Sequence, residues 1–288
     1  MDSFKVIARK SRSVLSIALY SVRQRILHPR VICLLVIMGI FIWSRFSFVG
    51  EAVAITGARV NPLMFTFVAS DIIYALVLFA GVVFLYSDAP FIDKSQPYVI
   101  IRSNRMTWAA GQILHVMIFS AIWFLLLNLL TAVILLPHAT FATDGWGKLI
   151  RTLSQNHLGL EILFDIPTST VRLYSPLSAF LMNFLLDWGM ATFIGLLTFA
   201  VNLRLNKMVG PLVSGAVLMF DLLTVNELGI YHISPLSLAR LNQLDPTGTT
   251  IYPTPTYALC FYAVSAVILS SIIMILVRKL PIETAAES

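Results

Sequence analysis

Long apolar stretches recur along this sequence and constrain its fold more than any other feature. They cover roughly 31–49, 63–86, 107–136, 176–203, 208–228 and 256–277. A helix needs about 20 apolar residues to cross a bilayer, whereas a barrel strand needs only about 10 residues of alternating polarity. Only 12% of the residues are charged, against about 25% in an ordinary soluble domain. The pattern predicts an all-α integral membrane protein with six transmembrane helices in one domain, residues 1–288.

Lysine and arginine fall mostly on one side of these predicted spans. Fourteen of the 20 precede the first span, lie between spans two and three or four and five, or follow the sixth. Basic residues that flank membrane helices favour the cytoplasm. The sequence therefore predicts a multi-pass protein of the cell membrane with both termini cytoplasmic. The net charge of +6 reflects this topology, and it does not indicate a nucleic-acid partner.

Residues 1–30 are basic and show helical periodicity. One apolar stripe carries Phe4, Ile7, Leu15, Ala18, Val22 and Ile26. Most of the basic residues lie off this stripe, so we expect a cytoplasmic amphipathic helix along anionic lipid headgroups. The alternative is a plain positively charged flank of the first span.

Two further segments lie between the predicted spans on the external side. Residues 137–175 have scattered charge and enough leucine and isoleucine to order, so we expect short helices packed on the outer membrane face. Residues 229–255 would place Arg240 and Asp245 inside a membrane span, and Pro235 would break it. We therefore expect a re-entrant or interfacial helical hairpin there, with a plain external loop as the alternative.

Motifs for catalysis or nucleotide binding are missing from the 288 residues. The sequence contains no G-x-x-x-x-G-K-[ST] phosphate loop, no H-E-x-x-H pair, no C-x-x-C pair and no G-x-S-x-G elbow. Cys33 and Cys260 both lie in apolar runs and are interpreted as small core residues. The expectation is a protein without catalytic residues, bound metal or cofactor of its own.

Three aspartates lie within predicted spans, and each is expected to face protein or water because a mid-bilayer carboxylate is costly. Asp71, Asp187 and Asp221 fall at similar depths, about 10–15 Å below the external surface at about 1.5 Å per residue. With Asn128 and Asn183 they form a candidate translocation path. The alternative is a set of unrelated structural anchors, paired with Arg45 or with polar neighbours such as Tyr74.

A compact mixed-charge stretch, DAPFIDKSQPYVIIRSNRMTW, separates the second and third spans. Ser87 or Asp88 is suited to cap a helix and Pro90 to its first turn, so a short helix is predicted that ends at Pro97. Exposed acids, aromatic anchors and a basic rim are typical of a surface that docks a soluble partner. The alternative is an ordinary loop with positive-inside arginines.

These features together resemble the ABC-2-type permease subunits of bacterial ATP-binding-cassette exporters. The resemblance rests on the basic N-terminal helix, six spans, the apolar insertion between spans five and six, and the local stretch DAPFIDKSQPYVIIRSNRMTWAAGQ. It implies a coupling helix at 88–105 in the cleft of a separate ATPase, with two permease subunits, homodimeric or heterodimeric, and two ATPases. ATP and Mg²⁺ would bind to that partner. The residues carried over as ATPase-facing or helix-orienting are Asp88, Phe91, Asp93, Tyr98, Arg102 and Arg105.

The resemblance implies an exporter in the bacterial plasma membrane, and an acidic path favours a peptide or another amphipathic or hydrophobic cargo. Three other functions stay open at the level of sequence. One is a membrane-embedded enzyme, for which no motif gives positive evidence. An ion-coupled secondary transporter predicts paired ionisable groups near the midplane and an internal repeat, and neither is evident. A non-transporting immunity or sensor subunit could also bind an ATPase.

Overall fold

The computed structural model describes residues 2–91, 104–141, 145–155, 159–224 and 230–279. These residues form helices joined by turns, and within them the only strand-like pairing is an isolated bridge between Val60 and Ala139. The α-helices are α1 (Asp2–Ile26), α2 (Pro29–Phe46), α3 (Phe48–Thr56), α4 (Phe65–Ser70), α5 (Ile72–Tyr86), α7 (Arg105–Leu135), α8 (Gly147–Leu153), α9 (Thr168–Leu173), α10 (Pro176–Arg204), α11 (Val209–Thr224), α12 (Pro235–Ala239) and α13 (Pro255–Lys279). Two 3₁₀ turns, η1 (Leu136–His138) and η2 (Leu241–Gln243), complete the order.

Among the described residues, four helical segments are long and apolar enough to cross a membrane: Pro29–Thr56, Arg105–His138, Pro176–Arg204 and Pro255–Lys279. They correspond to the first, third, fourth and sixth predicted spans. The second and fifth correspond to shorter apolar helices, Ile72–Tyr86 and Val209–Leu223. A 15-residue helix is about 22 Å long, which is less than the ~30 Å hydrocarbon core.

The prediction of one uninterrupted helix over 63–86 is wrong. Asp71 has an extended backbone conformation, with ψ 138°, and separates α4 from α5. Its side chain accepts hydrogen bonds from the backbone N–H groups of Ile73 and Tyr74, at 3.0 and 3.4 Å. The carboxylate thus caps a new helix, and the apolar run is divided at this point.

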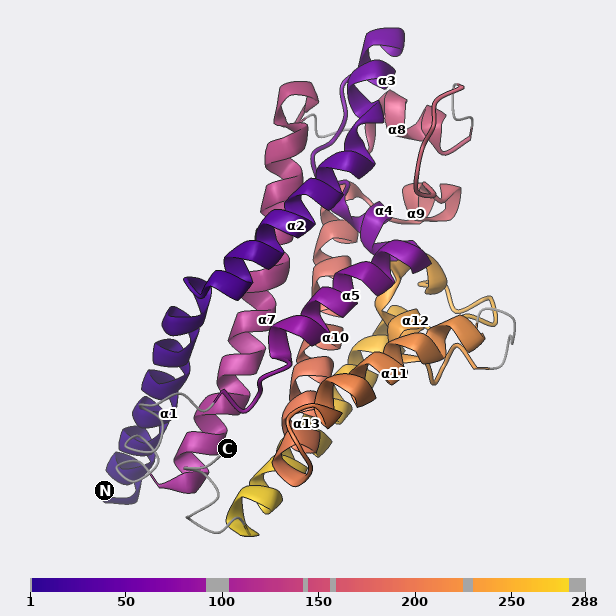
Figure 1. Ribbon diagram of the computed structural model, residues 1–288. Helices are drawn as coiled ribbons and strands as arrows, with labels where there is room; N and C mark the ends of the chain where they lie inside the picture. The colour runs from indigo at the N-terminus through magenta and orange to yellow at the C-terminus, as the bar shows by residue number, and fades with distance from the viewer. Residues whose placement is uncertain (1, 92–103, 142–144, 156–158, 225–229, 280–288) are drawn as a thin grey trace.

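Helices α7 and α10 lie at the centre of the fold, and the others pack around them (Figure 1). Helix α1 runs along the first half of α7, while α5, α11 and α13 pack against α10. Large side chains fill the interior, with Trp123 and Phe124 of α7, Phe79 of α5 and Phe199 of α10 all almost fully buried. The shared core fixes the polar residues on these helices relative to one another.

The predicted N-terminal helix is present as α1. Fewer residues of its predicted apolar stripe are buried against α7 than expected. Ala18 and Val22 are buried, but Leu15 and Ile26 of the same predicted stripe are exposed. The close approach depends on Gly111 of α7, where an added Cβ would lie 2.6 Å from Ile17 Cγ2. Packing on a glycine thus selects the buried face of α1. Its placement along lipid headgroups stays a prediction.

The described residues between 136 and 175 form a cap that packs on α2, α3 and α4. Trp146 is buried against Phe67, with ring centroids 4.7 Å apart, and its indole N–H donates to the Tyr174 carbonyl at 2.8 Å. Phe164 packs edge-on against Phe46 and Phe48. The expected short helices are therefore present as α8 and α9, packed on the helical bundle.

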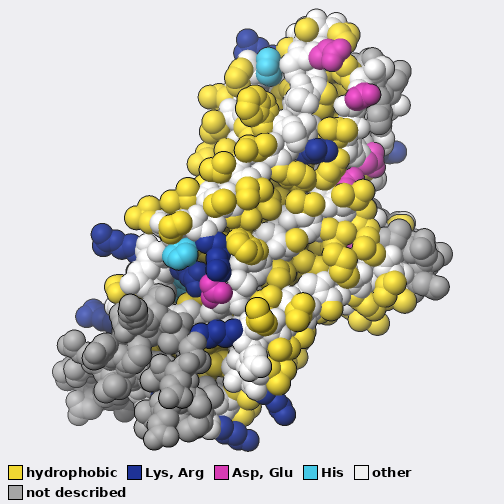
Figure 2. All heavy atoms as spheres, in the orientation of Figure 1, with side chains coloured by type: hydrophobic (Ala, Val, Ile, Leu, Met, Phe, Trp, Pro, Cys, Tyr) yellow, Lys and Arg dark blue, Asp and Glu magenta, His cyan; other side chains and the backbone are white. Residues whose placement is uncertain are grey.

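The end of the molecule opposite the cap carries most of the basic groups, and we call it the basic end. The start of α1, residues 87–91, the turn between α10 and α11 and the end of α13 all lie there (Figure 1). Lysine and arginine side chains gather at this end in the space-filling view, whereas acidic side chains lie mostly towards the cap (Figure 2). The four basic segments thus share one end, as the charge pattern predicts.

The predicted burial of the two cysteines is wrong. Cys33 of α2 and Cys260 of α13 are both exposed in the isolated chain. Their helices carry other exposed apolar side chains, such as Val36 and Val264. An apolar residue of a membrane helix can face lipid as readily as a protein core, so hydropathy alone does not distinguish the two.

Candidate coupling junction and buried acid cluster

The turn at residues 87–91, which we call the junction, follows α5 at the basic end. Ser87 was predicted to begin a helix, and instead it ends one. Its hydroxyl donates to the Phe84 carbonyl at 2.9 Å, back into the last turn of α5. The backbone N–H of Ser87 donates to the same carbonyl at 3.4 Å, so both groups of Ser87 close the last turn of α5. The predicted helix from Pro90 to Pro97 lies largely outside the described residues.

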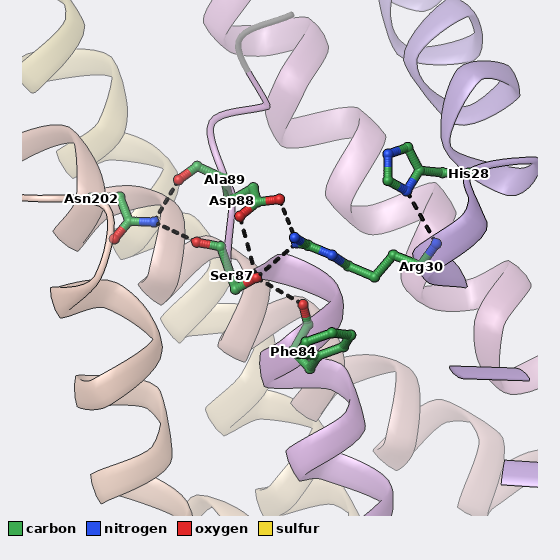
Figure 3. Close-up of polar contacts among 7 residues, drawn as sticks. All are labelled: His28, Arg30, Phe84, Ser87, Asp88, Ala89 and Asn202. Carbon is green, nitrogen blue, oxygen red and sulfur yellow. Dashed lines mark hydrogen bonds and ion pairs between the residues drawn. The ribbon is translucent and has the colours of Figure 1, made fainter. Parts of the chain in front are cut away.

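Arg30, at the start of α2, contacts the junction on its solvent-exposed side. Its guanidinium donates to the Ser87 hydroxyl at 3.1 Å and forms an ion pair with Asp88 (Figure 3). The backbone N–H of Arg30 donates to His28 Nδ1 at 3.3 Å. The Arg30 and Asp88 side chains are 30% and 52% exposed, and such a pair contributes about 0–1 kcal/mol. The pair therefore fixes the orientation of the turn and adds little to the stability of the fold.

Asn202, near the end of α10, contacts the junction on its buried side. Its side-chain N–H₂ group donates to the Ala89 carbonyl at 2.6 Å and to the Ser87 carbonyl at 3.2 Å (Figure 3). Its carbonyl oxygen accepts from the Gly210 backbone N–H of α11 at 2.9 Å. An added Cβ at Gly210 would lie 2.2 Å from Asn202 Oδ1, so this approach requires glycine. One buried amide thus links the junction to two helices.

Phe91, the last residue of the junction, is buried between α1, α5 and α7. The ring is only 5% exposed, and the guanidinium carbon of Arg25 in α1 lies 3.6 Å from its centroid. Edge-on contact with His115 of α7, at 5.3 Å between centroids, and contact with Tyr86 complete its surroundings. The expectation of an aromatic side chain in a solvated loop is wrong for Phe91, because the ring is enclosed by α1, α5 and α7. Its position fits the helix-orienting role instead.

The remaining predicted coupling residues are placed as follows. Asp93, Tyr98 and Arg102 lie outside the described residues. Arg105 is the first residue of α7 and is half-buried. Asn202, Arg25 and Arg30 are further parts of this site that were not predicted from the sequence. The available signal was a polar residue near the end of an apolar run, as Asn202 is in the stretch AVNLRLNK.

The buried aspartates each have a protein partner. Asp187 of α10 is fully buried and accepts from the Asn183 side-chain amide at 2.6 Å, one helical turn away. Asn128 donates to the Phe124 carbonyl of its own helix at 2.8 Å. These contacts agree with the alternative of structural anchoring. In this conformation the carboxylate of Asp187 does not face solvent.

Asp221 of α11 anchors the segment between α11 and α13. It is fully buried, forms an ion pair with Arg240 at 3.2 Å, and accepts from the hydroxyl of Ser234 at 2.6 Å and from that of Ser237. The Tyr262 hydroxyl of α13 donates to the Pro235 carbonyl at 2.6 Å. The short helix α12 is therefore held inside the bundle, and its re-entrant placement in a membrane stays a prediction. Sequence reasoning missed the pairing, although a lone arginine in PLSLARL required a buried acid.

Asp71 lies near this cluster without being enclosed by it. Burial lowers the pKa of Arg240, while the carboxylates of Asp221 and then Asp71 raise it. Asp71 is half-buried at the break between α4 and α5. The three predicted acids thus have different environments, and only Asp221 pairs with an arginine among the described residues.

The loop after η2 is ordered by Asp245. Its carboxylate accepts hydrogen bonds from the backbone and side chains of Thr247, Thr249 and Thr250, at 2.5–3.4 Å. Chiefly the bond from the Thr247 side chain lowers the pKa of Asp245 below its usual range. On the facing segment, burial and then the charge of Asp245 raise the pKa of Tyr174 to about 12.

Several buried polar atoms without a partner lie on α4, at the end of α9 and at residues 240–243, segments that pack against one another, and we call these six atoms the unpartnered group. It comprises Thr66 Oγ1, Ser70 Oγ, Tyr174 Oη, Arg240 Nε, Asn242 Oδ1 and Gln243 Oε1. Each is buried without a hydrogen-bond partner among the described residues. A buried polar atom left unpaired costs about 1–3 kcal/mol. Six of them together would offset most of the ~5–15 kcal/mol that holds a typical protein folded.

Within the described residues, no group of three histidine, cysteine, aspartate or glutamate side chains is arranged to hold a metal ion. Comparison of the chain with protein-family models, curated proteins and solved structures found no match.

Proposed function

We propose that this chain is the permease subunit of an ATP-binding-cassette exporter, in which the segment 88–105 receives a separate ATPase. The observation that supports the proposal best is the construction of the junction. Four separate helices hold it, through Arg25 of α1, Arg30 of α2, His115 of α7 and Asn202 of α10. A displacement of the segment that follows would therefore reach the centre of the bundle directly.

The absence of a phosphate-loop motif from the 288 residues also favours this function. A transporter driven by ATP then needs its energy from another chain. Coupling requires that the partner contact the permease differently in two global states. The junction suits this requirement because its outer ion pair is exposed and exchangeable, while its inner amide is buried.

Co-purification tests the partner. A tagged chain, extracted from the membranes of its own host in mild detergent, should retain an ATPase of about 25–35 kDa, the size of one domain of that kind. Charge reversal of Asp93 and Arg102 together should release the ATPase. Charge reversal of Glu51 and Arg151, near the cap, is the matched control and should not. If the Asp93 and Arg102 variant retains both the ATPase and transport, the assignment of 88–105 is incorrect.

A second experiment tests whether the junction transmits movement. Asn202→Ala should keep the ATPase bound but lower ATP-driven uptake of a fluorescent cationic amphipathic peptide into inside-out vesicles by at least tenfold. Thr131→Ala is the matched control, because Thr131 is also buried but bonds only to a carbonyl of its own helix. Wild-type uptake by Asn202→Ala would refute transmission through the junction. ATPase binding without ATP-driven uptake by the unaltered chain would favour the sensor or immunity subunit.

A further inference from the structure

The unpartnered group gathers at one place in the fold, between α4, η2 and the end of α9. Thr66 and Ser70 are four residues apart on α4 and therefore share one face of that helix. Helix α4 packs against η2 and α10, and η2 packs against α9 and α12. The six atoms thus come from three segments that are far apart in the sequence and that pack against one another in the fold.

We propose that the unpartnered group lines a hydrated chamber at the base of the cap, in which ordered water satisfies these atoms. Its chemistry is mixed, because the amide oxygens of Asn242 and Gln243 accept, Arg240 Nε donates, and the hydroxyls do both. Water both donates and accepts, and a buried molecule typically makes about three hydrogen bonds. An apolar occupant would leave all six atoms unsatisfied.

Asp71 identifies the route by which water reaches the chamber. It follows Ser70 directly, it is only half-buried, and its charge acts on Arg240. A carboxylate that is partly solvated at the break between α4 and α5 lies at the rim of the proposed chamber. The chamber does not depend on the exporter proposal, since any function of the chain is compatible with water at this position.

Reaction of cysteines with silver ion tests the chamber, because Ag⁺ is close to water in size and travels only through hydrated paths. Cys33 and Cys260, which are exposed, are first replaced by alanine. Ser70→Cys and Thr66→Cys are then compared with Val68→Cys and Ala69→Cys, which are equally buried on the same helix. The proteins are placed in lipid nanodiscs, treated with Ag⁺, and the surviving thiols are labelled with a fluorescent maleimide after denaturation.

The two chamber positions should react at least threefold faster than the two controls. A smaller difference overturns the proposal. Thr66→Val and Ser70→Ala give an independent result where a cysteine variant fails to fold. If water satisfies the hydroxyls, their removal should leave the Tm unchanged or lower it, whereas a dry site predicts a higher Tm. Thr131→Val is the reference, because its hydroxyl has a protein partner, the Leu127 carbonyl.

Discussion

The buried ion pair between Asp221 and Arg240 makes the sharpest test of how the segment that contains α12 is held. We consider Asp221→Asn, Arg240→Met and the double variant. Asp221→Asn keeps an acceptor for the serine hydroxyls but leaves the guanidinium without its anion. Arg240→Met leaves the carboxylate with two hydroxyl donors and no cation. The double variant removes both charges and retains polar partners for the hydroxyls.

The burial of the pair sets the expected magnitude. The Arg240 and Asp221 side chains are 4% and 0% exposed. Water therefore cannot reach the charge that either single variant leaves behind. Removing one partner of a buried pair costs about 3–5 kcal/mol, whereas replacing both by neutral groups is often close to neutral. We therefore expect each single variant to lose about 3–5 kcal/mol and the double variant to regain about 2 kcal/mol or more of that loss.

Thermal unfolding in detergent, followed by tryptophan fluorescence, measures the effect. A loss of this size lowers the Tm by on the order of 10 °C at about 2–4 °C per kcal/mol. The exposed pair of Arg30 and Asp88 provides the matched cycle, with Asp88→Asn and Arg30→Met expected to couple by less than about 1 kcal/mol. If the losses of Asp221→Asn and Arg240→Met simply add in the double variant, the two charges are not coupled and the reasoning fails.

Three further predictions concern the junction and the loop after η2. Gly210→Ala forces a methyl group against Asn202 Oδ1 at 2.2 Å, and it should lower stability by about 1–3 kcal/mol in the same unfolding assay. Phe91→Leu removes the ring beneath Arg25; cleavage by trypsin at Arg25 should become faster, and unchanged cleavage would argue against the contact. The lowered pKa of Asp245 means that its stabilising contribution is present above its ordinary pKa of about 3.9 and is lost as the pH falls through the lower folded-state pKa. Hydrogen exchange of residues 245–250 should accordingly be protected at pH 6 and lose protection at strongly acidic pH, and Asp245→Asn should lack that dependence.

Several elements could be predicted from local pattern alone. The spans near 107–136, 176–203 and 256–277 coincide with α7, α10 and α13 to within about two residues, because a long apolar run has few other ways to satisfy its backbone in a membrane. The amphipathic helix at the N-terminus and the short helices of the cap also followed from periodicity and composition. The prediction failed at Asp71, where a side chain capped a new helix inside an apolar run.

The candidate site was harder to predict, because its contacts join residues that are distant in the sequence. The stretch beginning at Asp88 was recognisable as unusual, but its anchor Asn202 lies more than 100 residues later. Phe91 lies in a polar stretch of the sequence, but α1 and α7 enclose its ring in the structure. Sequence pattern indicates which residues are costly in an apolar setting, whereas their partners depend on the packing of the helices.

By itself, then, the sequence determined that the chain is helical, strongly apolar and asymmetric in charge, since these properties depend on composition and on local periodicity. Only the tertiary structure decided which buried acids are paired, and to what. Asp187 bonds within its own helix, whereas Asp221 meets Arg240 from a segment that folds back into the bundle. A buried charge must find its partner in three dimensions, and helix packing places that partner without regard to distance along the chain.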